Sequence, residues 1–161
     1  MPGIGHPGND LFVLVRISIK GVVVGGITDI VATNILAIPL TIVILTNLGA
    51  GHSAAERQAA VTAAFQPHGS LFTGMLIVGA FGSILGGYVA AWLARHDELL
   101  NGALSAWLCT AIGIYGIAAL PHMQPLWLQA VDFIMSPAAG LSGGYLRRLQ
   151  IRSSRIQAAK T

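Results

Sequence analysis

Four long apolar segments separated by short polar stretches constrain this chain more than any other feature of its sequence. They cover about residues 22–46, 71–94, 99–120 and 126–146. Each segment approaches the roughly 20 residues that a helix needs to cross about 30 Å of hydrocarbon. Only 9% of the 161 residues are charged, whereas an average soluble domain has about 25%. We therefore expect one all-α domain over residues 1–161, folded as a four-helix transmembrane bundle.

The uneven distribution of basic residues predicts how these segments are oriented. If the segments cross in succession, Arg57 alone falls on one side. The other side holds the remaining eight, which are Arg16, Lys20, Arg95, Arg147, Arg148, Arg152, Arg155 and Lys160. Lys and Arg near membrane-spanning segments are retained in the cytoplasm. We therefore expect both termini, the turn at residues 95–98 and the basic tail 147–161 to be cytoplasmic.

The segments on either side of the first span are predicted to lie outside the hydrocarbon. Adding residues 11–20 to the span would give a helix of roughly 54 Å, so we expect them to form an interfacial or cytoplasmic extension. Between the first two spans, Ser53 and Glu56 have the spacing of a capping box. We expect a short extracytoplasmic helix over about residues 54–66, and a tight turn at residues 121–125.

Small residues recur at helical spacing within the apolar segments, and this pattern predicts close helix packing. Glycine, alanine and serine at every fourth position allow helix backbones to approach closely in lipid. The second span carries two such rows, Gly79, Ser83, Gly87, Ala91 and Gly82, Gly86, Ala90, Ala94. The first span has Gly21, Gly25, Asp29 and Thr33, and the fourth has Gly140 and Gly144. We expect these rows to pack within the bundle rather than between protomers.

Asp29 is the most informative single residue, because it lies about 11 Å inside the cytoplasmic boundary if the span begins at Val22. A carboxylate in a membrane helix costs about 2.5–3.5 kcal/mol, so it should face protein or water. Candidate partners at its level are the hydroxyls of Ser83 or Ser105 and free glycine carbonyls. No Lys or Arg shares its depth, so we expect a buried and mostly protonated side chain. Asp29 either links neighbouring helices through hydrogen bonds, as a structural residue, or binds a proton or a cation as a functional site.

Other residues that stand out within the apolar segments give weaker indications of function than Asp29 does. Asn34 and Pro39 share the first span, where a proline-kinked polar helix suits a gated pathway but is also tolerated as shape. Asp132 lies about 9 Å inside the outer boundary, near the depth of Thr41 and Tyr115. With Asp29 it would mark two stations of a path. The lone Cys109 is expected to be a small buried core residue.

No residue set points to catalysis or to a bound metal or cofactor. His52, His68 and His122 lie in separate loops and lack the spacing of metal ligands, so we expect them to be solvated. The basic tail is better placed for anionic lipid headgroups than for nucleic acid. We therefore expect no cofactor, no metal and no nucleic-acid partner.

Residues 86–104, Gly-Gly-Tyr-Val-Ala-Ala-Trp-Leu-Ala-Arg-His-Asp-Glu-Leu-Leu-Asn-Gly-Ala-Leu, resemble a stretch of a known group of proteins. The group consists of small bacterial four-helix integral membrane proteins of uncharacterised function. The first span, with Asp29 within Gly-Gly-Ile-Thr-Asp-Ile, is also similar to theirs. The resemblance implies a multi-pass protein of the bacterial cytoplasmic (inner) membrane, and it brings no activity with it.

Together these features favour a non-enzymatic multi-pass protein with a helix-packing or assembly role. The alternative is a small transporter or channel component that uses the intramembrane carboxylate Asp29. A hydrated path at Asp29 would favour transport, and small-residue rows exposed to lipid would favour assembly. The expected partners are the lipid bilayer, anionic headgroups at the tail, and either a second copy or another membrane protein.

Overall fold

The computed structural model describes residues 16–49, 51–119 and 126–159, and only the backbone at 116–119 and 126–129. Within these ranges the fold is all-helical, as expected, with five helices and no strand. The helices are α1 (Ile19–Leu48), α2 (Ala54–Phe65), α3 (Phe72–Ala94), α4 (Glu98–Ala119) and α5 (Leu126–Ala158). The four long helices begin and end within a few residues of the predicted spans, except that α5 continues through the basic tail.

Some of the sequence predictions concern segments that the structure does not describe. Residues 11–15 of the expected extension, the turn at residues 121–125, His122 and Lys160 lie outside the described residues. The turn at residues 95–98 is described and is tight, with Arg95 at φ 58° and Asp97 at φ 43°. Among the described residues, α1 and α3 are each long and apolar enough to cross a membrane by length and composition.

The predicted capping box forms at the start of α2. The Ser53 hydroxyl accepts a hydrogen bond from the Glu56 backbone N–H at 3.2 Å, and the Ser53 backbone N–H donates to the Glu56 carboxylate at 2.7 Å. The bond from the Ser53 backbone holds the pKa of Glu56 below its ordinary value. Two free amides at the helix start are satisfied in this way, so the capping box fixes where α2 begins.

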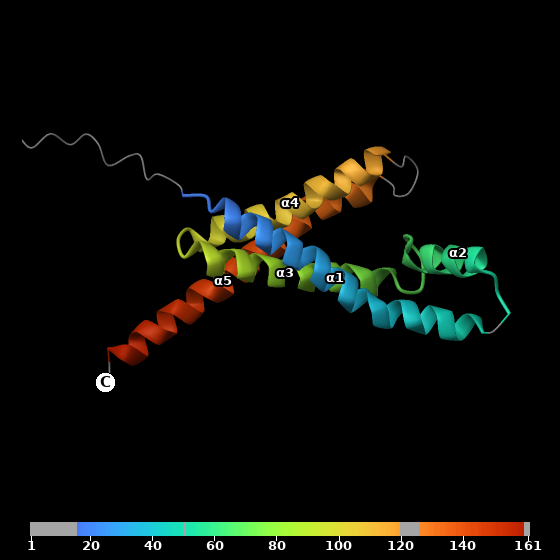
Figure 1. Cartoon of the computed structure of the whole chain (residues 1–161), viewed down its shortest axis with the longest axis horizontal. Coiled ribbons are helices and arrows are strands. Elements are labelled where there is room, and N and C mark those ends of the chain that lie inside the picture. The colour runs from blue at the N-terminus through green and yellow to red at the C-terminus, as the bar shows by residue number, and fades with distance from the viewer. Residues whose placement is uncertain (1–15, 50, 120–125, 160–161) are drawn as a thin grey trace, which may run out of the picture.

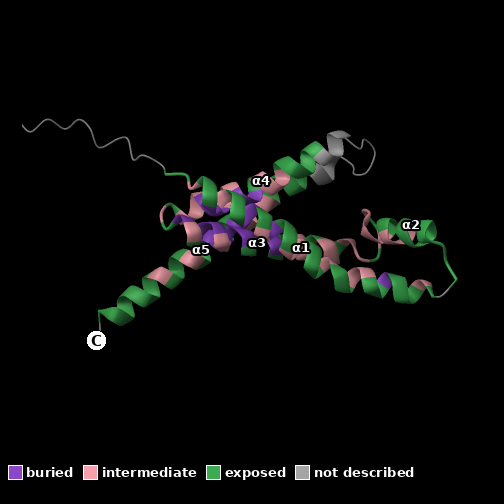
Figure 2. Ribbon diagram, in the orientation of Figure 1, coloured by how far each residue is buried: buried purple, intermediate pink, exposed green. Residues whose placement is uncertain are grey.

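The four long helices pack closely at one end and separate at the other (Figure 1). The packed half comprises residues 19–29, 82–94, 98–106 and 136–144, next to the 95–98 turn. The open half comprises residues 30–48, 72–81, 107–119 and 126–135, and α2 lies at its end. All described buried residues except Ile44 fall in the packed half (Figure 2). In the open half, α1 stays with α3 and α4 with α5.

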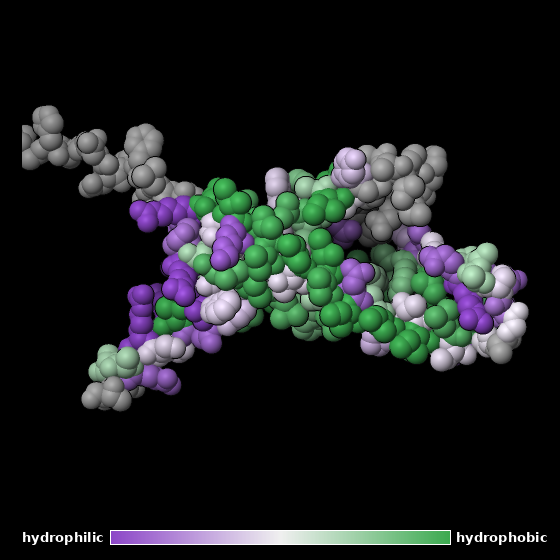
Figure 3. Space-filling view, in the orientation of Figure 1, coloured by the Kyte–Doolittle hydropathy of each residue, from purple (hydrophilic) through white to green (hydrophobic). Residues whose placement is uncertain are grey.

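The distribution of apolar and small residues is the reverse of that in a water-soluble protein. The buried positions are held by glycine, alanine, serine, asparagine and aspartate, with Ile44 the one large apolar side chain among them. Large apolar side chains point outward on all four long helices, for example Ile35, Phe81, Ile112 and Ile134. Figure 3 shows them gathered over the middle of one face, between hydrophilic ends. An apolar exterior around a core of small residues is typical of helices that pack in lipid.

The two small-residue rows of α3 contact two different helices: the row with Gly86 packs on α1, and the row with Gly87 packs on α5. A Cβ placed on Gly86 would lie 2.6 Å from the Gly25 carbonyl oxygen of α1, and one on Gly87 would meet the Gly140 backbone of α5. Gly140 in turn lies against Gly102 of α4. Because backbones approach this closely, even a methyl group has no room. Ser83, Gly86, Gly87, Gly140 and Gly144, which the sequence pattern assigns to helix packing, are all buried in the structure.

Gly79 does not take part in this packing, and the expectation for it is wrong. A Cβ at this position would meet no described atom within 4 Å. Gly79 keeps the four-residue spacing of its row but lies in the open half, where α4 and α5 have moved away from α3. The row therefore functions in packing only from Ser83 onward.

We expect Gly87→Leu to destabilise the protein strongly, because its side chain would meet the Gly140 backbone, which cannot rotate away. Overpacking of a core costs about 1–3 kcal/mol, and we expect at least the upper end of that range. Thermal unfolding in detergent measures the effect. Gly79→Leu is the matched control and should leave stability near that of the parent. Equal losses in the two variants would contradict the packing described here.

Candidate functional site

Asp29 lies at the inner edge of the packed half, where the open half begins, and has an exposed fraction of only 4%. It belongs to the same row as Gly25, and its Cβ lies against Gly86 of α3. The sequence-based expectation that Asp29 is buried at the level of Gly86 is therefore confirmed. A larger residue at Gly82 or Gly86 would collide with the Asp29 side chain or its backbone, so the glycines of α3 create the space that this carboxyl group fills.

Both carboxyl oxygens of Asp29 accept hydrogen bonds from hydroxyl groups of the protein. Ser83 of α3 donates to Oδ2 at 2.9 Å, and Thr33 donates to Oδ1 at 3.3 Å. The Ser83 oxygen also lies 3.3 Å from the Ser136 hydroxyl of α5. Since Ser83 has one proton, and it goes to Asp29, Ser136 must donate in this second contact. A continuous line of hydroxyls thus joins α1, α3 and α5.

The fourth long helix completes this polar cluster through Cys109 and Ala106. The Cys109 thiol of α4 lies beside the Asp29 carboxyl group and donates to the Gly26 carbonyl oxygen at 3.1 Å. The Ala106 carbonyl oxygen lies 3.5 Å from the Ser136 hydroxyl and is a second, longer acceptor for its single proton. Ser105, the other partner considered for Asp29, instead donates to Gly102 of its own helix at 2.8 Å. All four long helices therefore supply atoms to the surroundings of Asp29.

This arrangement is suited to holding helices together rather than to exchanging an ion with solvent. The carboxyl oxygens are each satisfied by a protein hydroxyl, and the side chain has almost no accessible surface. A buried polar group that is fully hydrogen-bonded specifies a unique packing, since any other arrangement leaves it unpaired. Among the described residues, no group of three or more His, Cys, Asp and Glu side chains is placed to hold a metal ion.

Asn34 and Asp132, the other polar residues singled out in the spans, do not join Asp29. Asn34 is exposed and donates to the Ile30 carbonyl oxygen of its own helix at 2.7 Å. Asp132 is exposed in the open half of α5. It makes no hydrogen bond or ion pair with any described residue. Of these three residues, only Asp29 belongs to a polar cluster, and Asn34 and Asp132 lie apart from it on the exterior.

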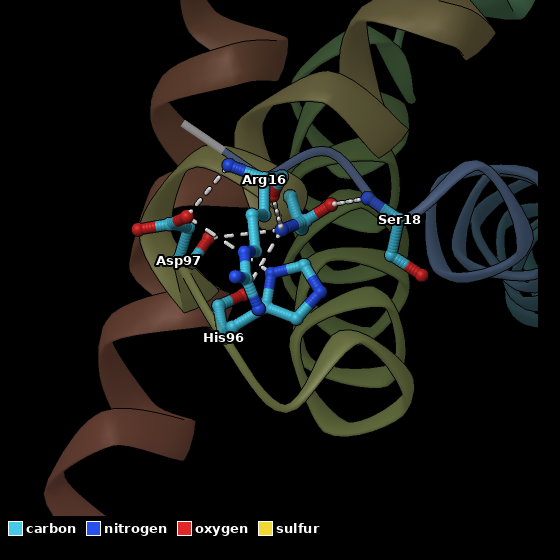
Figure 4. A network of polar contacts seen from close by, with 5 residues as sticks. Arg16, Ser18, His96 and Asp97 are labelled. Carbon is cyan, nitrogen blue, oxygen red and sulfur yellow. Dashed lines mark hydrogen bonds and ion pairs between the residues drawn. The ribbon is translucent and has the colours of Figure 1, made fainter. Parts of the chain in front are cut away.

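A second polar network, centred on Asn101, closes the packed half beside the 95–98 turn (Figure 4). Asn101 is fully buried, at 0% exposure. Its side-chain oxygen accepts from the Ser18 backbone N–H at 2.8 Å, while its amide donates to the carbonyls of His96 at 3.0 Å and Asp97 at 3.1 Å. The amide also reaches the Arg16 carbonyl at 3.3 Å. Asn101 therefore ties the start of α1 to the α3–α4 turn.

Asp97 of the α3–α4 turn adds a further hydrogen bond to the segment that precedes α1. Its carboxylate accepts from the Arg16 backbone N–H at 2.9 Å. The Ser18 hydroxyl then accepts from the Gly21 backbone N–H at 3.1 Å and caps the first turn of α1. Residues 81 or more apart in sequence thus combine to fix where α1 begins.

The sequence analysis did not single out Asn101 or Ser136, and it did not predict that Cys109 lies beside Asp29. Asn101 had one available signal, because an amide four residues after Asp97 and inside an apolar segment must find buried partners. Cys109 has no charged residue near it in sequence, yet the fold places it against Asp29. Its neighbour comes from a helix about 80 residues away, which single-sequence spacing does not reveal.

We expect Asp29→Asn to fold with nearly parental stability, because the amide keeps the shape and one acceptor for Ser83. Asp29→Leu should lose about 1–3 kcal/mol of unfolding free energy, since it removes the acceptor of both the Ser83 and the Thr33 hydroxyl. Asn34→Leu is the matched control on the exposed face of the same helix and should be neutral. Denaturation in detergent micelles measures all three, and parental stability of Asp29→Leu would count against the structural tie.

We expect Asn101→Asp to destabilise the protein by about 1–3 kcal/mol, although it preserves shape. The variant replaces the donor amide by an acceptor that faces the His96 and Asp97 carbonyls. Backbone hydrogen exchange at residues 18–22 should accelerate, because Ser18 loses its anchor. His96→Ala is the control, since it removes a side chain but keeps the carbonyl. Unchanged exchange in Asn101→Asp would refute the role assigned to this junction.

Comparison with known proteins provides no relative for this chain: no family model, no curated protein and no solved structure matches it. Its function is therefore inferred from its own residues and their arrangement.

Proposed function

We propose that the chain is a non-enzymatic integral membrane protein that crosses the bacterial cytoplasmic membrane four times and acts in membrane-protein assembly. The reversed distribution of residues carries this proposal. Across all four long helices, large apolar side chains face outward while small and polar ones are buried. In water such an exterior would be an extended apolar patch of a kind that soluble monomers rarely expose. In lipid it is the expected solvent-facing surface.

The positions of the basic residues in the fold support the proposed orientation. Arg16, Lys20, Arg95 and the arginines of the α5 extension belong to the end that carries the 95–98 turn. Arg57 lies in α2 at the opposite end. Positive residues collect on the cytoplasmic side, so this end with both termini is proposed to be cytoplasmic. There the extension places Arg148, Arg152 and Arg155 near anionic headgroups, at about 1 kcal/mol each.

The surroundings of Asp29 favour a structural role over transport. A transport site must exchange protons or ions with water, whereas Asp29 is 4% exposed and hydrogen-bonded through both oxygens within the protein. We therefore assign it to helix packing. The alternative of a small transporter that uses Asp29 would require this cluster to open toward one end of the bundle.

The open half supports an assembly role. The small-residue rows are used within the chain, so they do not provide the surface for a partner. That surface lies instead on the open halves of α4 and α5, which expose Asp132 together with large apolar side chains. An exposed carboxyl group among apolar residues is unfavourable in lipid, by up to about 2.5–3.5 kcal/mol at the bilayer centre. A protein partner that covers it removes this cost.

Reporter fusions test the proposed topology. A reporter active only in the cytoplasm should be active when fused at the C-terminus and inactive when inserted within residues 51–68, because seven of the eight described basic residues belong to the end opposite α2. A reporter active only outside should give the reverse pattern. An external C-terminus, or a cytoplasmic 51–68 segment, would overturn the four-span orientation.

A further inference from the structure

The open half of the α4–α5 hairpin carries an exposed phenol that can donate a hydrogen bond and an exposed carboxyl group that can accept one. Tyr115 of α4 is 78% exposed, and Asp132 of α5 is also exposed. Neither forms a hydrogen bond with another described residue. Other polar groups nearby differ, because the hydroxyls of Thr110 and Thr41 already donate to carbonyls of their own helices. The phenol can donate a hydrogen bond and the carboxyl group can accept one, and neither does so with another described residue.

The two groups lie at similar depth. Tyr115 precedes the end of α4 by four residues, and Asp132 follows the start of α5 by six, which places them about 6 and 9 Å from the ends that adjoin residues 120–125. Helix side chains lean toward the N-terminus of their own helix. In this antiparallel pair Tyr115 therefore leans toward the packed half and Asp132 away from it, which closes the offset between them.

Both residues lie on the face of the hairpin that turns toward α1 and α3. Tyr115 follows Leu108 by two turns, and Leu108 contacts Gly26 of α1. Asp132 precedes Ser136 by one turn, and Ser136 contacts Ser83 of α3. In the packed half this face is covered, but in the open half the two hairpins separate (Figure 1). The phenol and the carboxyl group are both exposed within this open half.

We propose that a second copy of this chain covers this face, with Tyr115 of each copy donating a hydrogen bond to the Asp132 carboxyl group of the other. This rests on the proposed membrane location. Two copies inserted in the same orientation are related by an axis along the membrane normal, which preserves the depth of every residue. Only groups of similar depth can then pair across the interface, and Tyr115 and Asp132 meet this condition. The pair forms twice in such an isologous dimer.

Exposed apolar residues around the pair provide the rest of the interface. Ile112 of α4 and Met135 of α5 are both exposed. Each lies three residues from Tyr115 or Asp132 and therefore on the same side of its helix. Packing between such side chains excludes lipid from the two hydrogen bonds. Interhelical hydrogen bonds in membranes contribute about 0.6–1.7 kcal/mol each, so loss of both should weaken the dimer by about tenfold or more.

Energy transfer between two populations of the full-length protein in lipid vesicles, each carrying a different fluorescent protein at the C-terminus, measures association. The parent should show transfer that depends on its density in the membrane. Tyr115→Phe and Asp132→Leu should each weaken self-association by about tenfold or more. Tyr145→Phe removes the hydroxyl of another exposed tyrosine of α5, in the cytoplasmic half, and should leave association unchanged.

A mixture of the two weakened variants gives the sharpest test. Neither variant can form the pair with itself, but a mixed dimer keeps one, between Tyr115 of the Asp132→Leu chain and Asp132 of the Tyr115→Phe chain. Transfer between the two variants should therefore exceed transfer within either one, and this recovery also shows that both are folded. A monomeric parent, a dimer insensitive to both substitutions, or no preference for the mixed dimer would each overturn the pairing. Reporter fusions with the predicted topology would leave the four-span proposal standing in any of these cases.

Discussion

The close approach of helix backbones at a few glycines determines the rest of this structure. Gly86 lies against Gly25 of α1, Gly87 lies against Gly140 of α5, and Gly140 lies against Gly102 of α4. In lipid there is no hydrophobic force between helices, so association depends on contact and on hydrogen bonds at short range. The glycines provide the contact, and by bringing the backbones together they also bring short polar side chains within reach of one another.

Ser83 illustrates how these two effects combine. It occupies the same row of α3 as Gly87, but it faces both α1 and α5, so one short side chain contacts Asp29 on one side and Ser136 on the other. A hydroxyl only one carbon from the backbone makes both contacts because the three helices are so close. If larger residues held the helices apart, Ser83 would reach neither partner, and Asp29 would be left buried and unpaired.

Sequence alone predicted the parts of the fold that depend on periodicity and local chemistry. The helix bounds, the capping box at Ser53, the small-residue rows and the burial of Asp29 each follow from patterns within one helix. The errors and omissions concern relations between helices. Gly79 has the correct spacing but lies beyond the point where the hairpins separate, and Cys109 lies beside a carboxyl group that comes from α1. Asn101 binds backbone groups at the start of α1, which no pattern within α4 specifies.

The same residues explain why the bundle is packed at one end and open at the other. Residues that can support close approach and buried hydrogen bonds stop near Thr33, Gly82, Ala106 and Ser136. Beyond them, α1 and α5 present mostly large apolar side chains, and α5 has Pro137 at the boundary, where the backbone lacks one helical N–H donor. Small residues of this half such as Gly79 and Gly113 contact no other helix, so they do not bring α4 and α5 onto α1 and α3. In the proposed membrane location, lipid or protein must then fill the space between the hairpins. There, lipid would suit the exposed isoleucines but could not form hydrogen bonds with Tyr115 and Asp132, which is why we propose a protein partner at that position.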